Sequence, residues 1–202
     1  MKRIFWSLIL GLMSFTIISA QEISAERLAK IKSDAMKGDA EAQETLGILI
    51  CNRDINNPKI YNKSKNEAEA IKWFYKAALQ GMPFSQWTYG FFNEVGRGGL
   101  PVNLQEAVKW YQKAADQGYP SAQLFLSKLY MEGKGVEKNE EEAIKWVLKA
   151  AMQGDKDSQS QLGYYYFYGK GVKVNKEEAR NWFNKAASQG DEYAIDFLNK
   201  YF

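Results

Sequence analysis

The sequence predicts an all-α protein, an α-solenoid of about four stacked helix-turn-helix repeats with a capping helix at each end. One segment recurs four times along the 202 residues, with its tryptophan spaced by 37, 36 and 36 positions. Each copy contains a helix-start pattern, apolar residues at helical spacing and a closing glycine. Because one helix pair cannot bury its apolar face alone, stacked copies are needed to form a core.

The repeats are defined by positions that stay in register. Each second half begins with Asn, continues through Ala-x-x-Trp and Lys-Ala-Ala, and ends in Gln-Gly. The tryptophans are Trp73, Trp110, Trp146 and Trp182, and the closing glycines are Gly81, Gly118, Gly154 and Gly190. A small residue follows four places after each glycine, at Ser85, Ala122, Ser158 and Ala194. This register predicts repeats over about 39–81, 82–118, 119–154 and 155–190, followed by a partial helix over 191–202.

The second helix of each copy has a clear start and end. In copy three, Asn139 and Glu142 form a capping box, in which the asparagine accepts from the first turn and the glutamate reaches back. The same pair recurs as Asn66/Glu69, Asn103/Glu106 and Asn175/Glu178. Ala143 and Trp146 fall on one helix face. Gly154 ends the helix in the left-handed conformation that glycine adopts at little cost.

The first helix of each copy precedes a glycine turn. In copy four it starts near Ser158 and presents Leu162, Gly163 and Tyr166 to its neighbours. Gly163 predicts a close approach of another helix. The loop over 169–172 then turns the chain, as do the corresponding loops over 133–136 and 96–100.

The first twenty residues have the features of an export signal. Lys2 and Arg3 precede an apolar run over 4–18, which is short for a membrane span. The pattern predicts a signal peptide over 1–20, cut near Ala20-Gln21, and a periplasmic or secreted mature protein. An uncleaved N-terminal anchor is the alternative. Residues 21–38 are then an N-terminal capping helix, and 39–202 are the repeat array.

Composition excludes several classes of protein. The net charge is +3, of which the signal segment supplies two, so the mature chain is near +1 and no nucleic-acid partner is predicted. Histidine is absent and Cys51 is the single cysteine. No intrachain disulfide, metal or other cofactor is therefore predicted. No membrane span follows the signal segment, and we expect a monomer.

These residues resemble the Sel-1-like repeat family, a relative of the tetratricopeptide repeat. The family pattern is Ala-x3-Leu-Gly-x2-Tyr-x2-Gly-x-Gly-Val, then Ala-x2-Trp-Tyr-x-Lys-Ala-Ala-x2-Gly. Copy four follows it closely, with Ser158 for alanine, and copy three has Ser127 for the first glycine. Copy two has Tyr89 for leucine and Asn93 for tyrosine, and copy one lacks the glycine loop. The resemblance covers about 39–190 and implies a binding scaffold.

The resemblance also implies that first helices line a concave groove. Carried over by position, the predicted partner-binding residues are Trp87, Phe91, Glu94, Leu124, Lys128, Met131, Tyr164, Phe167 and Tyr168, with Ile48, Cys51 and Ser160 at corresponding positions. Tyr89 and Tyr166 are assigned to the core. The other aromatic residues over 87–92 and 164–168 either form an exposed binding surface or pack between adjacent copies.

Two features of copy one have both a structural and a functional interpretation. Cys51 falls at a groove position, but no histidine exists to activate it, so a structural cysteine is favoured. The loop over 52–65 is about seven residues longer than its counterpart in copy three. Such insertions often lie on the binding face, although a tolerated surface loop is favoured.

Catalysis is not supported by any motif. The chain lacks the regular cysteine pairs of family members linked to β-lactams, and it lacks the motifs of acylating enzymes, so a β-lactamase-like hydrolase is a distant third hypothesis. Glu94 and Glu132 form no recognisable carboxylate pair. The leading hypothesis is a non-catalytic scaffold that binds a protein in its groove, in sharper form an immunity protein that neutralises a toxic secreted effector such as a lipase. The alternative is a cell-envelope or host-interaction factor that binds peptidoglycan or a receptor.

Overall fold

The computed structural model describes residues 23–52 and 63–202, so the predicted signal peptide and most of the copy-one insertion lie outside the described residues. Within these two ranges the chain forms ten α-helices and no strand. The helices are α2 (Ala25–Lys37), α3 (Ala40–Asn52), α4 (Lys63–Leu79), α5 (Pro83–Val95), α6 (Leu104–Asp116), α7 (Pro120–Glu132), α8 (Glu140–Met152), α9 (Lys156–Tyr168), α10 (Lys176–Ser188) and α11 (Glu192–Tyr201). The predicted all-α solenoid is confirmed.

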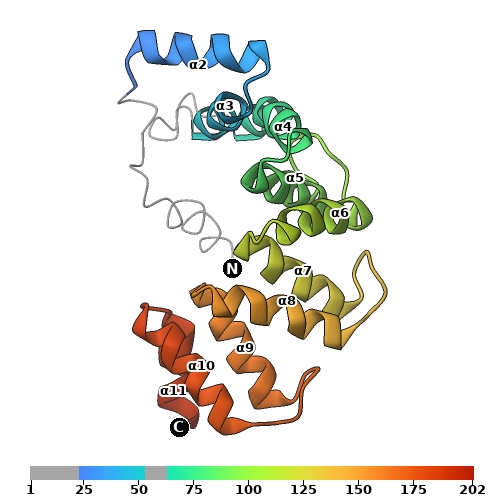
Figure 1. The fold of residues 1–202 in the computed structure, drawn as a ribbon, viewed down its shortest axis with the longest axis vertical. Helices are drawn as coiled ribbons and strands as arrows, with labels where there is room; N and C mark the ends of the chain where they lie inside the picture. Colours follow the sequence, from blue (N-terminus) through green and yellow to red (C-terminus); the bar gives the residue numbers. More distant parts are fainter. Residues whose placement is uncertain (1–22, 53–62) are drawn as a thin grey trace.

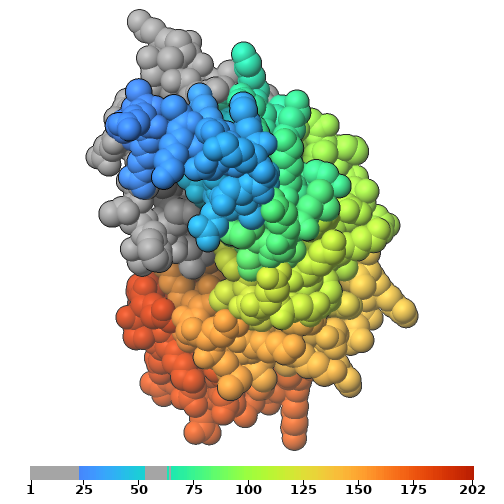
Figure 2. Space-filling model, turned by 45° about the horizontal axis from the view of Figure 1, so that its top comes forward, coloured from blue at the N-terminus to red at the C-terminus, as the bar shows by residue number. Residues whose placement is uncertain are grey.

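Consecutive helices pack side by side and build a curved stack (Figure 1). The space-filling view shows the same order as successive layers, from blue through green to red (Figure 2). The odd-numbered helices α3 to α9 are the first helices of the four copies, and the even-numbered helices α4 to α10 are the second. Among helices that are not consecutive, α7 and α9 make the main contact in the described part of the chain. First helices therefore lie on the inner side of the curve. No described helix is long and apolar enough to cross a membrane.

The second helices begin at the predicted asparagines in copies two to four. The side chain of Asn103 accepts a hydrogen bond from the backbone N–H of Glu106 at 3.0 Å, and Asn139 and Asn175 do the same. The predicted reach of the glutamate back to the asparagine N–H is wrong. That N–H already donates to the end of the first helix, for example from Asn103 to the carbonyl of Asn93 at 2.8 Å.

Copy one departs from this pattern. Helix α4 has 17 residues where α6, α8 and α10 have 13, and it begins three residues before Asn66. Asn66 is consequently a buried residue inside the helix, and the predicted capping box at this position is wrong. The difference is local, because Lys63, Ser64 and Lys65 belong to α4, whereas the corresponding residues 136–138 of copy three precede α8.

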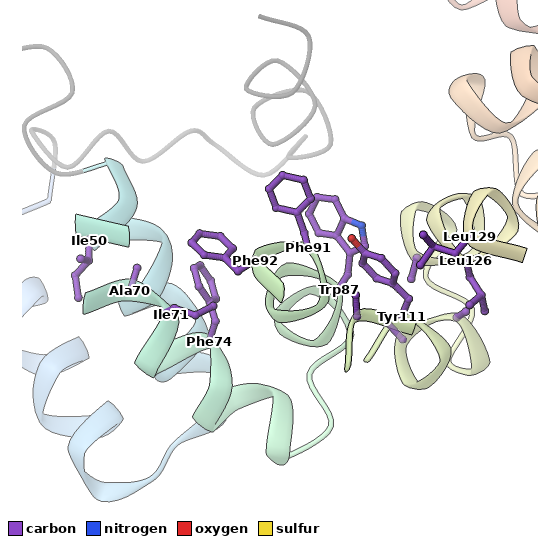
Figure 3. Close-up of a cluster of buried hydrophobic side chains, with 14 of the residues drawn as sticks. Ile50, Ala70, Ile71, Phe74, Trp87, Phe91, Phe92, Tyr111, Leu126 and Leu129 are labelled. Atoms are coloured by element: carbon purple, nitrogen blue, oxygen red, sulfur yellow. The ribbon is translucent and has the colours of Figure 1, made fainter. Parts of the chain in front are cut away.

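In copies one, two and four, a glycine of the first helix packs against an aromatic ring of the second helix. A Cβ atom at Gly90 would stand 2.9 Å from the ring of Tyr111, and one at Gly163 would stand 3.0 Å from the ring of Phe183. Both rings are fully buried. Copy three, which has Ser127 in place of the glycine, has the smaller Val147 at the ring position. The predicted close approach at Gly163 is confirmed, and Figure 3 shows Tyr111 within the resulting core.

Pairs of glutamines link the repeats, and nothing in the sequence pattern predicted them. In copy three, the buried Gln123 donates to the carbonyl of Ala115, at the end of the preceding second helix, at 3.1 Å. The amide of the exposed Gln153 donates to Gln123 Oε1 at 2.8 Å. Equivalent pairs are Gln43 with Gln80, Gln86 with Gln117, and Gln159 with Gln189. The buried amide of each pair thus finds hydrogen-bond partners in two neighbouring helix ends.

Candidate functional site

The first helices of copies two and three bury part of the predicted groove. Trp87 and Phe91 are only 3% and 9% exposed, and Leu124 is also buried. The ring of Trp87 lies 5.9 Å from the rings of both Tyr119 and Phe125 on the next copy. Figure 3 shows Trp87 and Phe91 side by side on α5. For these residues, packing between adjacent copies describes the structure better than an exposed aromatic surface does.

Charged side chains follow on the same face. Glu94 accepts a hydrogen bond from the hydroxyl of Tyr111 at 2.6 Å. Burial raises the pKa of the Glu94 carboxyl, although the hydrogen bond from Tyr111 and the charge of Lys128 oppose that shift. Burial lowers the pKa of Lys128, and the carboxylates of Asp157 and Glu94 oppose that shift. The structure thus places predicted site residues from α5 and α7 within electrostatic reach of each other, while Met131 is half-buried against the core.

The first helix of copy four is the most open part of the predicted groove. Tyr168 is exposed, whereas Tyr164 and Phe167 are half-buried. The rings of Tyr164 and Tyr168 lie 4.6 Å apart, and those of Phe167 and Tyr168 lie 5.0 Å apart. The structure therefore brings these three predicted residues together.

The assignment of tyrosines to the core needs one correction. Tyr165 is the buried tyrosine of α9, whereas Tyr166, which was assigned to the core, is half-buried against it. Tyr89 is also half-buried. The run of consecutive aromatic residues over 164–168 gives no periodicity by which sequence could rank them.

A small pocket opens between α3 and α5. It has a volume of about 40 Å³, and Ile48, Cys51, Phe84, Thr88 and Phe91 are among the residues that line it. Burial raises the pKa of Cys51 to about 11, and Arg97 opposes the shift only in part. The thiol is thus protonated near neutral pH, which fits a structural cysteine, because the thiolate is the nucleophile.

Among the residues that the structure describes, no three His, Cys, Asp or Glu side chains are arranged to hold a metal ion. Sequence reasoning did not include Tyr193 and Tyr201 of α11 in the site: Tyr201 contacts Phe167 of α9, and Tyr193 contacts Phe183 of α10 and Phe197 of α11. A signal existed, because six aromatic or large apolar residues fall within the partial helix that was predicted over 191–202.

A curved stack of helix pairs whose inner face carries aromatic and charged side chains is the architecture of a helical-repeat scaffold. The Sel1 repeat pattern matches residues 61–82, 83–119, 120–155 and 156–191, so the chain belongs to the Sel1 repeat family. These limits lie within one residue of the predicted boundaries of copies two to four. Family and fold together indicate a protein–protein interaction scaffold. Comparison with curated protein sequences gives no match.

Solved structures resemble the chain along most of its length. A protective antigen of uropathogenic Escherichia coli strains is 36% identical with a TM-score of 0.74, over 85% of this chain and 35% of that one. A Sel1 repeat protein from Oxalobacter formigenes is 33% identical with a TM-score of 0.71, over 86% of this chain and 68% of that one. An immunity protein from Pseudomonas aeruginosa is 21% identical with a TM-score of 0.56, over 95% and 67%, and shows the shared fold. The chain therefore spans about a third of the E. coli protein.

Proposed function

We propose that this protein is an exported, non-catalytic scaffold that binds a partner protein on the inner face of its first helices. One observation carries the proposal. The first helices carry Glu94, Lys128, Tyr164, Phe167 and Tyr168 on the inner side, where solvent reaches them in part. Tyr164 and Phe167 also pack against the core, but part of each ring stays accessible. Partly exposed aromatic side chains are typical of interfaces.

In its sharper form, the proposal is an immunity protein that neutralises a toxic secreted effector such as a lipase. The basic, apolar and small-residue order of residues 1–20 supports export to the compartment in which such an effector would act. The fold is compatible with this role, since the immunity protein from Pseudomonas aeruginosa shares it. A gene for a toxic phospholipase beside the gene for this chain, whose product co-purifies with it, is the expected finding.

The second candidate is an envelope or host-interaction factor. The observation that favours it is the 36% identity to a protective antigen of uropathogenic Escherichia coli, because an antigen has to be accessible to the host. Binding to purified peptidoglycan or host-cell surfaces, with no effector recovered, would support this candidate over immunity.

Co-purification from periplasmic extract tests the general proposal. A tagged wild-type chain is expected to retain a protein partner, and Lys128→Glu is expected to release it because the charge on the inner face is reversed. Lys145→Glu on the exposed side of α8 makes the same charge change on the outer side and is the matched control. Recovery of no partner by the wild-type chain, or equal loss with both variants, would contradict the proposal.

A further inference from the structure

One end of the array exposes a group of aromatic side chains. We define the α9–α11 patch as Tyr168, Tyr193, Tyr201 and Phe202, which are 47%, 51%, 43% and 42% exposed. Other large apolar side chains with this degree of exposure, such as Met36, Leu79 and Met152, belong to three separate helices. Figure 1 shows α9, α10 and α11 together at the end of the stack. Contiguous apolar surface of this kind marks an interaction site more often than scattered residues do.

The patch rests on a buried aromatic base. Phe197 is buried and stacks on Phe183 with 4.3 Å between ring centroids. Phe197 also contacts Tyr201 at 4.5 Å and Phe167 at 4.9 Å, and Phe167 lies 5.8 Å from Phe202. Because the exposed rings are supported from below, they lose little side-chain entropy when a partner covers them.

Four cations surround these rings. Lys170 lies over Tyr164 at 5.1 Å, Lys176 over Phe167 at 5.4 Å and Lys200 over Tyr201 at 5.1 Å. Arg180 lies over Phe202 at 5.8 Å. A cation above a ring keeps its hydrogen-bond donors available for a further acceptor.

The acidic groups nearby leave these cations available. In the described part of the chain, no ion pair engages Lys170, Lys176, Arg180 or Lys200, in contrast to Lys134, which pairs with Glu132 at 2.6 Å. Asp191 is held by the backbone N–H of Ala194 and by the hydroxyl of Ser160. Glu192 and Asp196 are exposed carboxylates on α11 itself.

We infer that the α9–α11 patch is a docking surface for an acidic segment of a partner protein that carries aromatic or large apolar side chains between its carboxylates. The inference rests on the proposed function and names the chemistry of the partner. Rings on the partner would cover the exposed aromatic surface, and its carboxylates would reach the four cations. A nucleic acid could use the same rings and cations, but its continuous phosphate backbone would lie against Glu192 and Asp196.

A defined polymer tests this chemistry without knowledge of the partner. The probe is a fluorescent random copolymer of glutamate and tyrosine, added to the mature chain at physiological ionic strength, with binding followed by anisotropy. We expect the copolymer to bind about tenfold more tightly than polyglutamate, since polyglutamate offers charge but no ring. A copolymer of lysine and tyrosine is expected not to bind. Equal binding of polyglutamate, no binding of the glutamate–tyrosine copolymer, or tighter binding of oligothymidylate would each overturn the inference.

Variants locate the binding surface. We expect Lys176→Glu combined with Arg180→Glu, and separately Phe202→Ala, to weaken copolymer binding by about tenfold. The matched control is Lys113→Glu combined with Lys149→Glu, because these lysines lie 3.9 Å over Trp110 and Trp146 on second helices and carry the same charge. Equal losses in patch and control variants would assign the binding to net charge and overturn the inference. Circular dichroism checks the fold, and Lys176→Gln with Arg180→Gln serves if the charge reversal unfolds the chain.

The same variants separate this inference from the proposed function. A periplasmic partner that Lys128→Glu releases and the patch variants retain would sustain the proposed function and overturn the docking surface. Specific copolymer binding without any recovered partner would sustain the surface chemistry and count against the proposed scaffold role.

Discussion

The first helices of copies two and four, α5 and α9, occupy the same place in the repeat but differ in whether their aromatic side chains are buried or exposed. In α5 the second residue after the repeated small position is Trp87, which the next copy covers with Tyr119 and Phe125. In α9 the same position is Ser160, and Tyr168 remains exposed. Phe125 and Phe197 occupy equivalent positions, but Phe125 is tilted against Tyr111 at 5.5 Å whereas Phe197 stacks on Phe183 at 4.3 Å. The position of a side chain in the repeat therefore determines whether it faces a neighbouring helix. The size of the neighbouring residues determines whether solvent still reaches it.

The largest expected difference between the two regions comes from truncating one aromatic residue in each. Trp87→Ala removes a buried indole and leaves a cavity, which costs about 3–5 kcal/mol of unfolding free energy. Tyr168→Ala removes a ring that is 47% exposed and is expected to cost about 1 kcal/mol or less. Urea denaturation of both variants measures the difference. Equal losses would show that the two surfaces are equally buried, which would break the comparison.

A second prediction concerns the contact between glycine and ring that the two regions share. Gly90→Ser and Gly163→Ser each drive a side chain into a fully buried ring, so each is expected to cost about 1–3 kcal/mol. In copy four, adding Phe183→Val reproduces the Ser127 and Val147 pair of copy three. We expect the double variant to lose less unfolding free energy than the two single variants lose together, as measured in a double-mutant cycle. Simple additivity would show that glycine and ring are not coupled.

The glutamine links give a third, smaller effect. Gln123→Leu removes the side-chain hydrogen bonds that Gln123 makes with the carbonyl of Ala115 and the amide of Gln153, at a cost of about 1 kcal/mol, because the carbonyl also accepts from the N–H of Gly118 and Gln153 is exposed. Ile195 of α11 stands at the same repeat position but is exposed, so Ile195→Gln is expected to change stability by less than about 0.5 kcal/mol. Thermal unfolding of the two variants makes the test. A larger effect at Ile195 than at Gln123 would contradict the structural role of the glutamines.

The smallest effect is a dependence on pH at Glu94. Burial raises the pKa of this carboxyl above its ordinary value of 4.5, so the folded chain holds the proton more tightly than the unfolded chain does. The associated stability is present below the unfolded pKa and is lost as pH rises through the folded pKa. Glu94→Gln keeps an acceptor for the Tyr111 hydroxyl but does not titrate, so its stability relative to wild type should increase from pH 4 to pH 7.

Urea denaturation at the two pH values measures this trend. The groups that face Glu94 are Lys128, Lys134 and Glu132, and none of them is altered in the variant. Glu141→Gln, exposed on α8, controls for the loss of one negative charge. A relative stability of Glu94→Gln that falls with rising pH would mean that the electrostatic attraction of Lys128 outweighs the effect of burial on Glu94.

The sequence by itself determined the number of repeats, the helix starts in copies two to four and the glycine contacts. These features depend on local interactions, such as the Asn139 cap and the absent Cβ at Gly163, and local interactions recur wherever the same residues recur. The resemblance to the Sel-1-like repeat family, carried over position by position, also placed Glu94, Lys128 and Tyr168 on the first helices, where the structure has them. Their role in partner binding stays a prediction.

Only the tertiary structure decided which of those residues reach solvent. Trp87 and Tyr168 look alike as aromatic residues on first helices, but the rings that cover Trp87 come from residues more than thirty positions along the chain. The exposed rings of α9 and α11 and the cations above them form one surface because the stack brings Arg180 of α10 beside Phe202, whereas Lys200 is the sequence neighbour of Tyr201. Whether a side chain is buried depends on residues that are distant in sequence, so a local sequence pattern does not reveal it.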